Sequence, residues 1–282
     1  MKNDKIITLA LAALMTVSLP TACSSKAAPE NSAEAEPQSR LETVLNAGKI
    51  TNVCEPYFAP FEFIDNTKSG QEQFRGADME LARYIAQELG VELEIVPMEW
   101  SAVLTGVASG KYDMAVAGMA YTPERAETMA MSDIYKPGGE QGLLVAADKI
   151  DEYTSLESFA GAKVAFQSGT LQEQNVLTQL PDAEPVTFDI VQNAVLALAS
   201  GKVDAVSVSV DNGNMFSAAN PSVAVAAARF DISKNGNAIG FPKGETELVD
   251  AVNKIIAKVK EQGLYDQWLA EAVSDAEQLG IK

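Results

Sequence analysis

The sequence has no histidine and only two cysteines among its 282 residues. Catalytic triads built on imidazole, and metal sites built on histidine or clustered cysteine, are therefore excluded. Carboxylates, lysines, tyrosines and hydroxyls are the side chains left for acid–base or nucleophilic chemistry. No paired catalytic constellation stands out among them, and no metal or other cofactor is expected.

Basic residues are scarce as well. Lysine and arginine together number 21 against 39 aspartates and glutamates, which gives a formal net charge of −18 at pH 7. Nucleic acids and anionic lipid surfaces are bound through clustered positive charge, so neither is expected as a partner. No heptad pattern or long apolar surface is legible, and the chain is expected to be a monomer.

Long apolar runs are confined to the N-terminus. A short basic start precedes an apolar stretch, residues 6–19, that is too short to span a bilayer. Two small residues then lead to Cys23. This pattern predicts a secretory signal peptide over residues 1–22.

A cysteine directly after such a run resembles the bacterial lipobox, in which the thiol is acylated and cleavage leaves it as the first residue. Pro20 stands where leucine is usual, so an ordinary signal peptide cut near Ala22 is the alternative. The lipobox implies lipid attachment at Cys23, on the outer face of the cell membrane. It also leaves Cys54 without a disulfide partner, and a buried structural thiol is expected there.

The residues after Cys23 are mainly serine, alanine, proline and glutamate, with no aromatic or β-branched side chain up to Ser39. Such a composition cannot bury enough apolar surface to order the chain. Residues 23–40 are therefore predicted to be a lipidated cysteine and a disordered tether that holds a folded body away from the membrane. About 240 residues follow, enough for two lobes with substantial cores.

The chain contains one internal repeat. Leu104 to Gly118 has the sequence LTGVASGKYDMAVAG, and Val195 to Ser209 has VLALASGKVDAVSVS. Both copies share Ala-Ser-Gly-Lys and an aspartate two residues later, which predicts a helix, a glycine stop and a strand. Two related α/β lobes would place Gly118 and Ser209 at the carboxyl ends of equivalent strands. Open α/β sheets bind ligands at that edge, so a cleft between two lobes is expected.

Two prolines lie among four aromatic residues in the segment 55–63, EPYFAPFEF. The prolines predict a stiff loop and not a strand. In one interpretation Phe58, with Tyr57, forms an aromatic wall for a flat or aliphatic part of a ligand. The alternative is a loop packed on its own core, which is favoured for Phe61 and Phe63.

Thr122-Pro-Glu-Arg125 has the signature of a helix start. Threonine suits the N-cap, proline the first helical position, and glutamate the positive end of the helix. Arg125 is then held near backbone N–H groups, where its guanidinium fork can bind a carboxylate through two hydrogen bonds. The same four residues also begin ordinary surface helices, which is the alternative when the motif is taken alone.

Two further segments predict helices beside strands. Residues 76–90 place Leu81, Ile85 and Leu89 on one stripe that ends at a glycine, the pattern of a helix docked on a sheet. Residues 164–170, VAFQSGT, predict a strand, a small-residue turn and a helix start. That turn is a second place for an anion, with a plain loop as the alternative.

Several motifs occur together in an order and spacing that resemble extracellular solute-binding protein family 3, which serves polar amino acid ABC importers. They are Phe58-Ala-Pro-Phe-Glu-Phe, Gly76-Ala-Asp-Met-Glu-Leu, Trp100, Gly118-Met-Ala-Tyr-Thr-Pro-Glu-Arg125, Ser132-Asp-Ile-Tyr135, Ser168-Gly-Thr170, Val203-Asp-Ala-Val and Gly263-Leu-Tyr-Asp-Gln-Trp268. The resemblance extends from Leu41 to about Leu269, and the combination is specific although each motif alone is not. Ala77 departs from the pattern, since an aromatic or branched apolar residue is usual there.

The resemblance implies a periplasmic binding protein type II fold, in which two Rossmann-like α/β lobes are joined by a two-stranded hinge. Residues 41–137 and 239–282 would form lobe 1, and residues 138–238 would form lobe 2 with the hinge crossings. The chain would not be an enzyme. It would capture a free amino acid, polar or basic, and deliver it to the ABC permease subunits in the membrane, to which its lipid anchor holds it.

The resemblance also assigns residues to the ligand. Arg125 and Thr170 would bind the α-carboxylate from opposite lobes, so that the ligand's contacts are complete only when the cleft is shut. Trp100 would form a second aromatic wall opposite Phe58.

Glu55 matches a carboxylate that faces the ligand's side chain in this family, and it would favour a cation or an amide. A solvated charge at a strand end is the alternative for this residue. Gln167 would line the far side of the pocket, and Leu171 would cap it.

The positions that usually hold the ligand's α-ammonium depart from the family. Ala120 and Ser209 stand where threonine and aspartate are usual. The Gly118 carbonyl remains, and Asp211 is expected on the same strand face as Ser209 because side chains alternate along a strand. Either Asp211 binds the amine, or the strand ends before it, or the ligand lacks a primary α-amine.

Three other functions stay open. The chain could serve an importer for a carboxylate solute without a primary α-amine, or it could report a bound ligand to a membrane receptor. The same fold also carries cleft enzymes such as prephenate or arogenate dehydratases. In that case Glu55 or Asp211 would act as the acid, provided that burial raises its pKa.

Overall fold

The computed structural model describes residues 38–232 and 236–281. The predicted signal peptide, Cys23 and nearly all of the predicted tether lie outside the described residues. The first element is α1 (Arg40–Ala47), which Ser39 and Glu42 begin with a reciprocal capping box. Residue 40, the last one assigned to the tether, is therefore helical.

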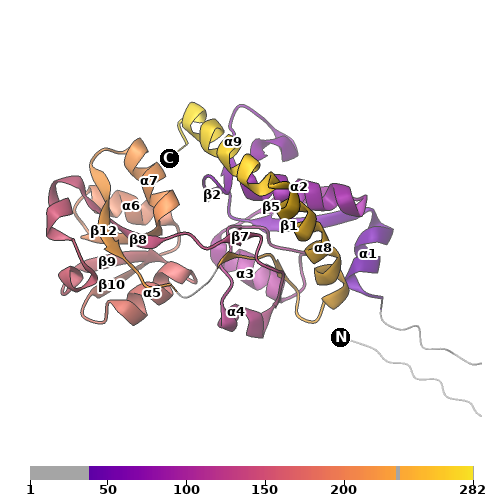
Figure 1. The fold of residues 1–282 in the computed structure, drawn as a ribbon, viewed down its shortest axis with the longest axis horizontal. Coiled ribbons are helices and arrows are strands. Elements are labelled where there is room, and N and C mark those ends of the chain that lie inside the picture. Colours follow the sequence, from indigo (N-terminus) through magenta and orange to yellow (C-terminus); the bar gives the residue numbers. More distant parts are fainter. Residues whose placement is uncertain (1–37, 233–235, 282) are drawn as a thin grey trace, which may run out of the picture. The chain divides into compact units, whose positions relative to one another are not determined.

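Two α/β lobes make up the described chain (Figure 1). Lobe 1 contains α1, β1 (Lys49–Cys54), β2 (Tyr57–Phe58), β3 (Glu62–Ile64), the 3-10 turn η1 (Gly70–Gln73), β4 (Phe74–Arg75), α2 (Ala77–Leu89), β5 (Glu92–Pro97), α3 (Trp100–Ala108), α4 (Pro123–Thr128), β6 (Ala130–Met131), β14 (Gly240–Phe241), α8 (Thr246–Gln262) and α9 (Leu264–Leu279). Lobe 2 contains β8 (Gln141–Ala146), the 3-10 turns η2 (Ala147–Glu152) and η3 (Leu156–Phe159), β9 (Lys163–Gln167), α5 (Leu171–Gln179), β10 (Glu184–Phe188), α6 (Val191–Ala199), β11 (Ala205–Ser209), α7 (Val210–Ala219) and β12 (Val223–Arg229). The short strands β7 (Lys136–Pro137) and β13 (Gly236–Asn237) pair antiparallel where the chain passes between the lobes.

The sheet of lobe 2 has the strand order β10-β9-β11-β8-β12. Its central strands β9, β11 and β8 are buried along nearly their whole length, which places them between two layers of helices. Leu143 and Val145 pack with α5 on one face, whereas Leu144, between them in β8, packs with α6 and α7 on the other. The sheet is therefore covered by helices on both sides (Figure 1).

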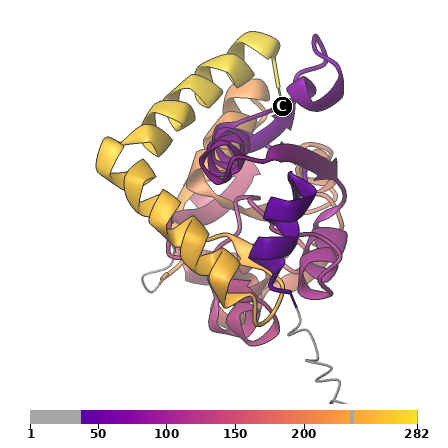
Figure 2. The same cartoon turned by 90° about the vertical axis from the view of Figure 1, so that its right-hand side faces the viewer.

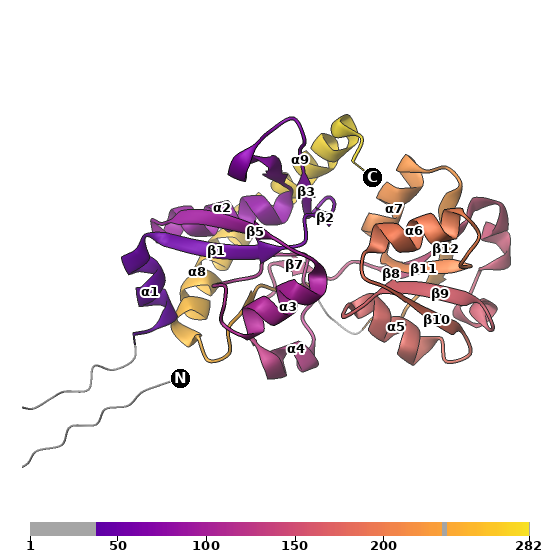
Figure 3. The same cartoon turned by 180° about the vertical axis from the view of Figure 1, so that it is seen from behind.

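Lobe 1 has the same layering around a smaller ladder. Strands β1 and β5 pair in parallel, and the segment after α3 joins them through a parallel bridge between Asn52 and Met114. Met114 packs with α2 and α8, whereas the next residue, Ala115, packs with α3. Figure 3 shows β1 and β5 with α2 and α3 nearby. The two lobes thus share one arrangement of layers, with helices on both faces of a ladder.

The repeat itself has the predicted helix, glycine and strand order. Gly110 and Gly201 follow α3 and α6 with φ of 74° and 70°, a conformation that favours glycine. The second copy then forms the continuous strand β11. The first copy differs, because its strand is reduced to bridges at Met114 and Ala115.

The two C-terminal helices, α8 and α9, return the chain to lobe 1. Gly263, with φ of 63°, ends α8 and directly precedes α9. Figure 2 shows the two helices meeting at an angle. Trp268 in α9 packs on Tyr84 in α2, with ring centroids 5.7 Å apart. Among the described helices, none combines the length and the apolar character that a bilayer crossing requires.

The prediction of a stiff loop over residues 55–63 is wrong in part. Tyr57 and Phe58 form β2 and pair antiparallel with Phe63 and Glu62 of β3. The prolines of this segment flank β2 instead of interrupting it, so no ladder hydrogen bond is lost. Cys54, just before this segment, is fully buried.

Candidate ligand-binding site

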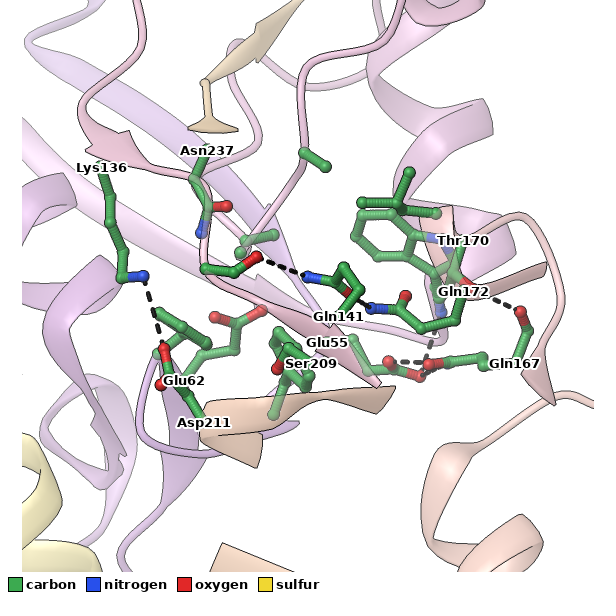
Figure 4. Close-up of a pocket in the computed structure, with 18 of the residues that line it drawn as sticks. Glu55, Glu62, Lys136, Gln141, Gln167, Thr170, Gln172, Ser209, Asp211 and Asn237 are labelled. Atoms are coloured by element: carbon green, nitrogen blue, oxygen red, sulfur yellow. Dashed lines mark hydrogen bonds and ion pairs between the residues drawn. The ribbon is translucent and has the colours of Figure 1, made fainter. Parts of the chain in front are cut away.

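A pocket lies between the two lobes, at the carboxyl ends of β1, β9 and β11 (Figure 4). This is the edge at which open α/β sheets bind ligands. All ten residues that the sequence assigns to the ligand line this one pocket: Glu55, Phe58, Trp100, Gly118, Ala120, Arg125, Gln167, Thr170, Ser209 and Asp211. Leu171 lines it as well.

Arg125 is held by a short capped helix. Thr122 accepts a hydrogen bond from the Arg125 N–H at 3.2 Å, and Pro123 is the first residue of α4, as predicted. The guanidinium donates to the Ala120 carbonyl at 2.6 Å. It also lies 5.3 Å from the centroid of the Trp100 ring. Burial lowers the pKa of Arg125 to about 10, so the side chain stays cationic at neutral pH.

The Gly169 carbonyl of lobe 2 accepts hydrogen bonds from two side chains of lobe 1. It accepts a hydrogen bond from Arg125 Nη2 at 2.9 Å and one from Trp100 Nε1 at 3.0 Å. On another side of the pocket, Asn212 of lobe 2 donates to the Ala59 carbonyl of lobe 1 at 3.1 Å. Direct contacts between the lobes therefore surround the pocket.

Glu55 and Gln167 form the second polar end of the pocket. The Gln167 amide donates to the two carboxylate oxygens of Glu55 at 3.0 and 2.9 Å, and the Trp100 N–H donates to one of them at 3.3 Å. Only 5% of Glu55 is exposed, so the alternative of a solvated strand-end charge is wrong. Burial raises the pKa of Glu55, while the Gln167 hydrogen bonds oppose that shift.

The predicted role of Thr170 is not supported by its hydroxyl contacts. Thr170 Oγ1 donates to the Gln167 carbonyl at 2.6 Å and accepts from the Glu173 N–H at 3.3 Å, because Thr170 is the N-cap of α5. Glu173 also accepts from the Gly169 N–H at 2.7 Å. The hydroxyl and this N–H of the turn are thus satisfied within the protein, and neither is left free for an anion.

The prediction that Asp211 shares a strand face with Ser209 is wrong. Strand β11 ends at Ser209, whose hydroxyl caps α7 by accepting from the Asn212 N–H at 3.3 Å. Asp211 therefore lies in the first turn of α7 and has half of its side chain, 51%, exposed. It forms an ion pair with Lys136 at 3.5 Å, so it is at the rim of the pocket and already has a cation.

The aromatic wall is built from two residues of the β2–β3 hairpin. Phe58 stacks on Phe61 with ring centroids 5.2 Å apart and an interplanar angle of 30°. Phe61 was assigned to the core, and it is buried, but it also lines the pocket. Gly118 has φ of 57°, and a Cβ there would approach the Phe58 ring to 2.8 Å. Glycine is thus required where the ring covers the backbone.

Sequence reasoning missed five polar residues of the pocket, which are Glu62, Lys136, Gln141, Gln172 and Asn237. Glu62 was visible within the motif FAPFEF, as a charge inside a segment of buried aromatics. Lys136 and Asn237 come together through the β7–β13 pairing. Gln172 donates to Gln141 at 2.7 Å. Gln172 directly follows Leu171, which the sequence places at the pocket, whereas no local signal marks Lys136, Gln141 or Asn237.

Asp78 lies behind the pocket and holds Gly118 in place. Its carboxylate is fully buried and accepts from the Gly118 N–H at 2.5 Å, from Tyr135 Oη at 2.7 Å and from Tyr265 Oη at 2.5 Å. Burial raises the pKa of Asp78, and these three donors oppose the shift. The sequence marked its helix as core only, and it missed this second role.

Comparison with known protein families identifies the family of this chain. The model of the bacterial extracellular solute-binding proteins, family 3, matches residues 50–272. The chain belongs to this family. Its match spans both lobes and includes every lining residue of the pocket.

Named proteins resemble the chain over most of its length. The chain is 25% identical over 232 residues to the ABC transporter arginine-binding protein 1 of Escherichia coli, covering 80% of this chain and 92% of that protein. It is 27% identical over 274 residues to the ABC transporter glutamine-binding protein of Bacillus subtilis, covering 95% of this chain and 98% of that protein. A Streptococcus pneumoniae amino acid ABC transporter substrate-binding protein, solved with bound L-arginine, is 36% identical with a TM-score of 0.79, covering 84% and 98%. The fold is therefore that of the periplasmic amino acid-binding proteins.

Proposed function

We propose that the chain binds a free amino acid in this pocket and delivers it to an ABC permease, without chemical turnover. The observation that carries the proposal is that two groups of opposite charge, the Arg125 guanidinium and the buried Glu55 carboxylate, line the same pocket. Arg125 would bind the α-carboxylate through its fork. Phe58 and Trp100 would enclose the aliphatic part of the ligand.

The ligand that fits this charge pattern best is a basic amino acid. Glu55 is a buried carboxylate whose hydrogen bonds from Gln167 support its ionised form. A buried anion favours a cationic partner, and a guanidinium offers paired N–H donors to it. The arginine-binding relatives support L-arginine as the first candidate, and the glutamine-binding relative makes L-glutamine the second.

Calorimetric titration of the purified protein with L-arginine, L-lysine, L-glutamine, L-histidine and L-cystine tests the proposal. We expect the tightest binding for L-arginine. Glu55→Gln should weaken L-arginine by about 10- to 100-fold, since a charged hydrogen bond is worth about 1.5–3 kcal/mol, while L-glutamine changes by less than about threefold. The matched control is Gln167→Ala, which should weaken both ligands without reversing their order.

Two outcomes would contradict this proposal. If none of the five amino acids binds, the pocket does not serve free amino acids. If a carboxylate solute binds and new products accumulate on incubation, the chain is a cleft enzyme and not a transport protein.

Release of the ligand requires the lobes to part. We propose that the chain bends at the β7–β13 pair, where both crossings run side by side. Gly138 and Gly139 follow β7 directly and have no side chain to restrain rotation. The contacts to the Gly169 carbonyl would break on opening, and ligand binding would restore them by favouring the closed form.

We further propose that Cys23 carries the lipid that holds the protein outside the cell membrane. Family membership supports an extracytoplasmic location, and the sequence around Cys23 supports acylation. Cells that express the chain and are fed a labelled fatty acid should label it. Cys23→Ser should abolish the label, whereas the matched control Cys54→Ser should keep it, because Cys54 is buried in the folded body.

If Cys23→Ser retains the label, the lipid is attached elsewhere. If neither protein is labelled but the N-terminus is cleaved near Ala22, the alternative of an ordinary signal peptide is correct.

A further inference from the structure

The pocket contains a buried carboxylate that nothing in the described chain pairs. Glu62, in β3, is 1% exposed, and its Oε2 has no hydrogen-bond partner among the described residues. Glu62 lines the ligand pocket, and its Oε2 lies 3.8 Å from the position that a Cβ on Gly118 would occupy. A buried polar group without a partner is costly, so a native protein that keeps one calls for an explanation.

No positively charged side chain of the described chain pairs with Glu62. Glu55 and Asp78 are both anionic neighbours that disfavour ionisation of Glu62. Lys136 lines the same pocket, but its ammonium pairs with Asp211 at 3.5 Å and lies 5.5 Å from the centroid of the Phe61 ring. Arg125 donates instead to the Ala120 and Gly169 carbonyls. No cation of the described chain therefore pairs with Glu62, and a cationic partner would have to come from outside the protein.

The groups expected to bind a ligand's α-ammonium are absent or occupied. Ala120 has no side-chain acceptor, and its carbonyl binds Arg125. The Ser209 hydroxyl accepts from the Asn212 N–H, and Asp211 is paired at the rim. Figure 4 shows Glu62 at a different end of the pocket from the Glu55–Gln167 pair, so Glu62 is not part of the proposed side-chain subsite.

We propose that Glu62 binds the α-ammonium of the amino acid ligand, in the role that Ala120 and Ser209 do not fill. This inference rests on the proposed function. The nearby Gly118 backbone, held by Asp78, completes the subsite. One contact would thus supply a partner for Glu62 Oε2 and replace the amine-binding side chains that are missing at Ala120 and Ser209.

Proton release accompanies this contact. Burial raises the pKa of Glu62 well above its usual value, and the charges of Asp78 and Glu55 raise it further. Asp78 has three donors and Glu62 has none at Oε2, so in the empty pocket Glu62 holds the proton and Asp78 the charge. When an ammonium binds, Glu62 ionises and its proton leaves to solvent, which forms one ion pair and breaks one O–H bond. Affinity for the amino acid therefore rises with pH until the pKa of Glu62 in the empty protein is passed.

Other titratable groups face this subsite from each element around it. They are Asp78 from α2, Glu55 after β1, Lys136 from β7, Asp211 from α7, Arg125 from α4, and Tyr135 and Tyr265 behind Asp78. Arg125, with a pKa of about 10, keeps its charge throughout the neutral range, and burial raises the pKa of both tyrosines well above the usual value. Burial also raises the pKa of Asp78, but its three donors favour the ionised form, which leaves Glu55 as the other group that could release a proton on binding a cation. A control variant at Glu55 is therefore required.

The test compares L-arginine with 5-guanidinopentanoate, which has the same carboxylate and guanidinium but no α-amine. Titration of the wild-type protein and Glu62→Gln with both probes should show that Glu62→Gln weakens L-arginine by about 10- to 100-fold. The amine-free probe should change by less than about threefold. Titration at pH 7 in buffers of different ionisation enthalpy should detect proton release with L-arginine for the wild-type protein, and less of it for Glu62→Gln.

Two variants keep the test decisive. Glu55→Gln, the matched control, should weaken both probes alike because it faces the shared guanidinium. Ser209→Asp in the Glu62→Gln background should recover affinity for L-arginine, since it restores a carboxylate near the amine while aspartate remains a good N-cap. Thermal melts check that each variant folds.

Equal weakening of both probes by Glu62→Gln would overturn the proposal, as would unchanged affinity for L-arginine in that variant. The proposed function would survive either result. If the wild-type protein binds neither probe nor any of the five amino acids, the proposed function itself fails and this inference falls with it.

Discussion

Replacing Arg125 by alanine is expected to weaken amino acid binding by about 30- to 3000-fold. Truncating one partner of a buried, hydrogen-bonded charge pair costs about 2–5 kcal/mol, and each 1.4 kcal/mol is tenfold in affinity. In the proposed complex the loss falls on the ligand's α-carboxylate, which would be left buried without its guanidinium. The substitution also removes a contact between the lobes, because Arg125 donates to the Gly169 carbonyl.

Titration calorimetry with L-arginine measures this effect, and Arg125→Lys is its matched control. Lysine keeps the charge but loses the planar fork, so we expect an intermediate affinity. Trp100→Phe separates the second contribution, since it removes the other hydrogen bond to the Gly169 carbonyl but leaves the arginine in place. If Arg125→Ala binds L-arginine as tightly as the wild-type protein, the α-carboxylate is bound elsewhere and the proposed orientation is wrong.

Replacing Asp78 by alanine is expected to lower the free energy of unfolding by about 3–5 kcal/mol, a large loss for one substitution. The change leaves three buried donors without an acceptor, namely the Gly118 N–H and the hydroxyls of Tyr135 and Tyr265. Relief of the buried carboxylate's own desolvation offsets part of that cost. Urea denaturation followed by circular dichroism gives the value.

Tyr265→Phe is the matched control for this second prediction. It removes one hydrogen bond to the Asp78 carboxylate and should cost about 2 kcal/mol, less than Asp78→Ala. A loss for Asp78→Ala no larger than that of Tyr265→Phe would mean that water replaces the carboxylate and that the three donors are not a unit. The same variants should also weaken ligand binding, because Gly118 lines the pocket.

Local sequence signals predicted the elements that depend on neighbouring residues. The cap and first turn of α4 follow from Thr122 and Pro123. The stripe of Leu81 and Ile85 predicts the buried face of α2, and Gly90 predicts where the helix ends. The repeat predicted how α3 and α6 end, because each copy carries the glycine that follows its helix in the left-handed conformation. These features are encoded within a few residues of where they appear.

The incorrect or missing assignments concern positions where a capping residue ends a strand, or where pairing with a distant segment places a residue at the pocket. Asp211 was misplaced because Ser209, as an N-cap, ends the strand two residues earlier than assumed. Thr170 lines the pocket, as the sequence predicts, but the same capping geometry uses its hydroxyl. Lys136 reaches the pocket through strand pairing with a segment about 100 residues away, for which no local pattern exists.

The hydrogen bond from Trp100 to Gly169 also gives the protein a built-in optical reporter. The chain has two tryptophans, and the other, Trp268 in α9, packs on Tyr84 of α2, away from the cleft. Indole emission depends on the polarity around the ring and on the partner of its N–H. Separation of the lobes would replace a protein carbonyl by water at Trp100 while leaving Trp268 as a constant background. The proposed opening and closing of the cleft would therefore be followed in unlabelled protein by tryptophan fluorescence, with Trp268→Phe leaving a single tryptophan.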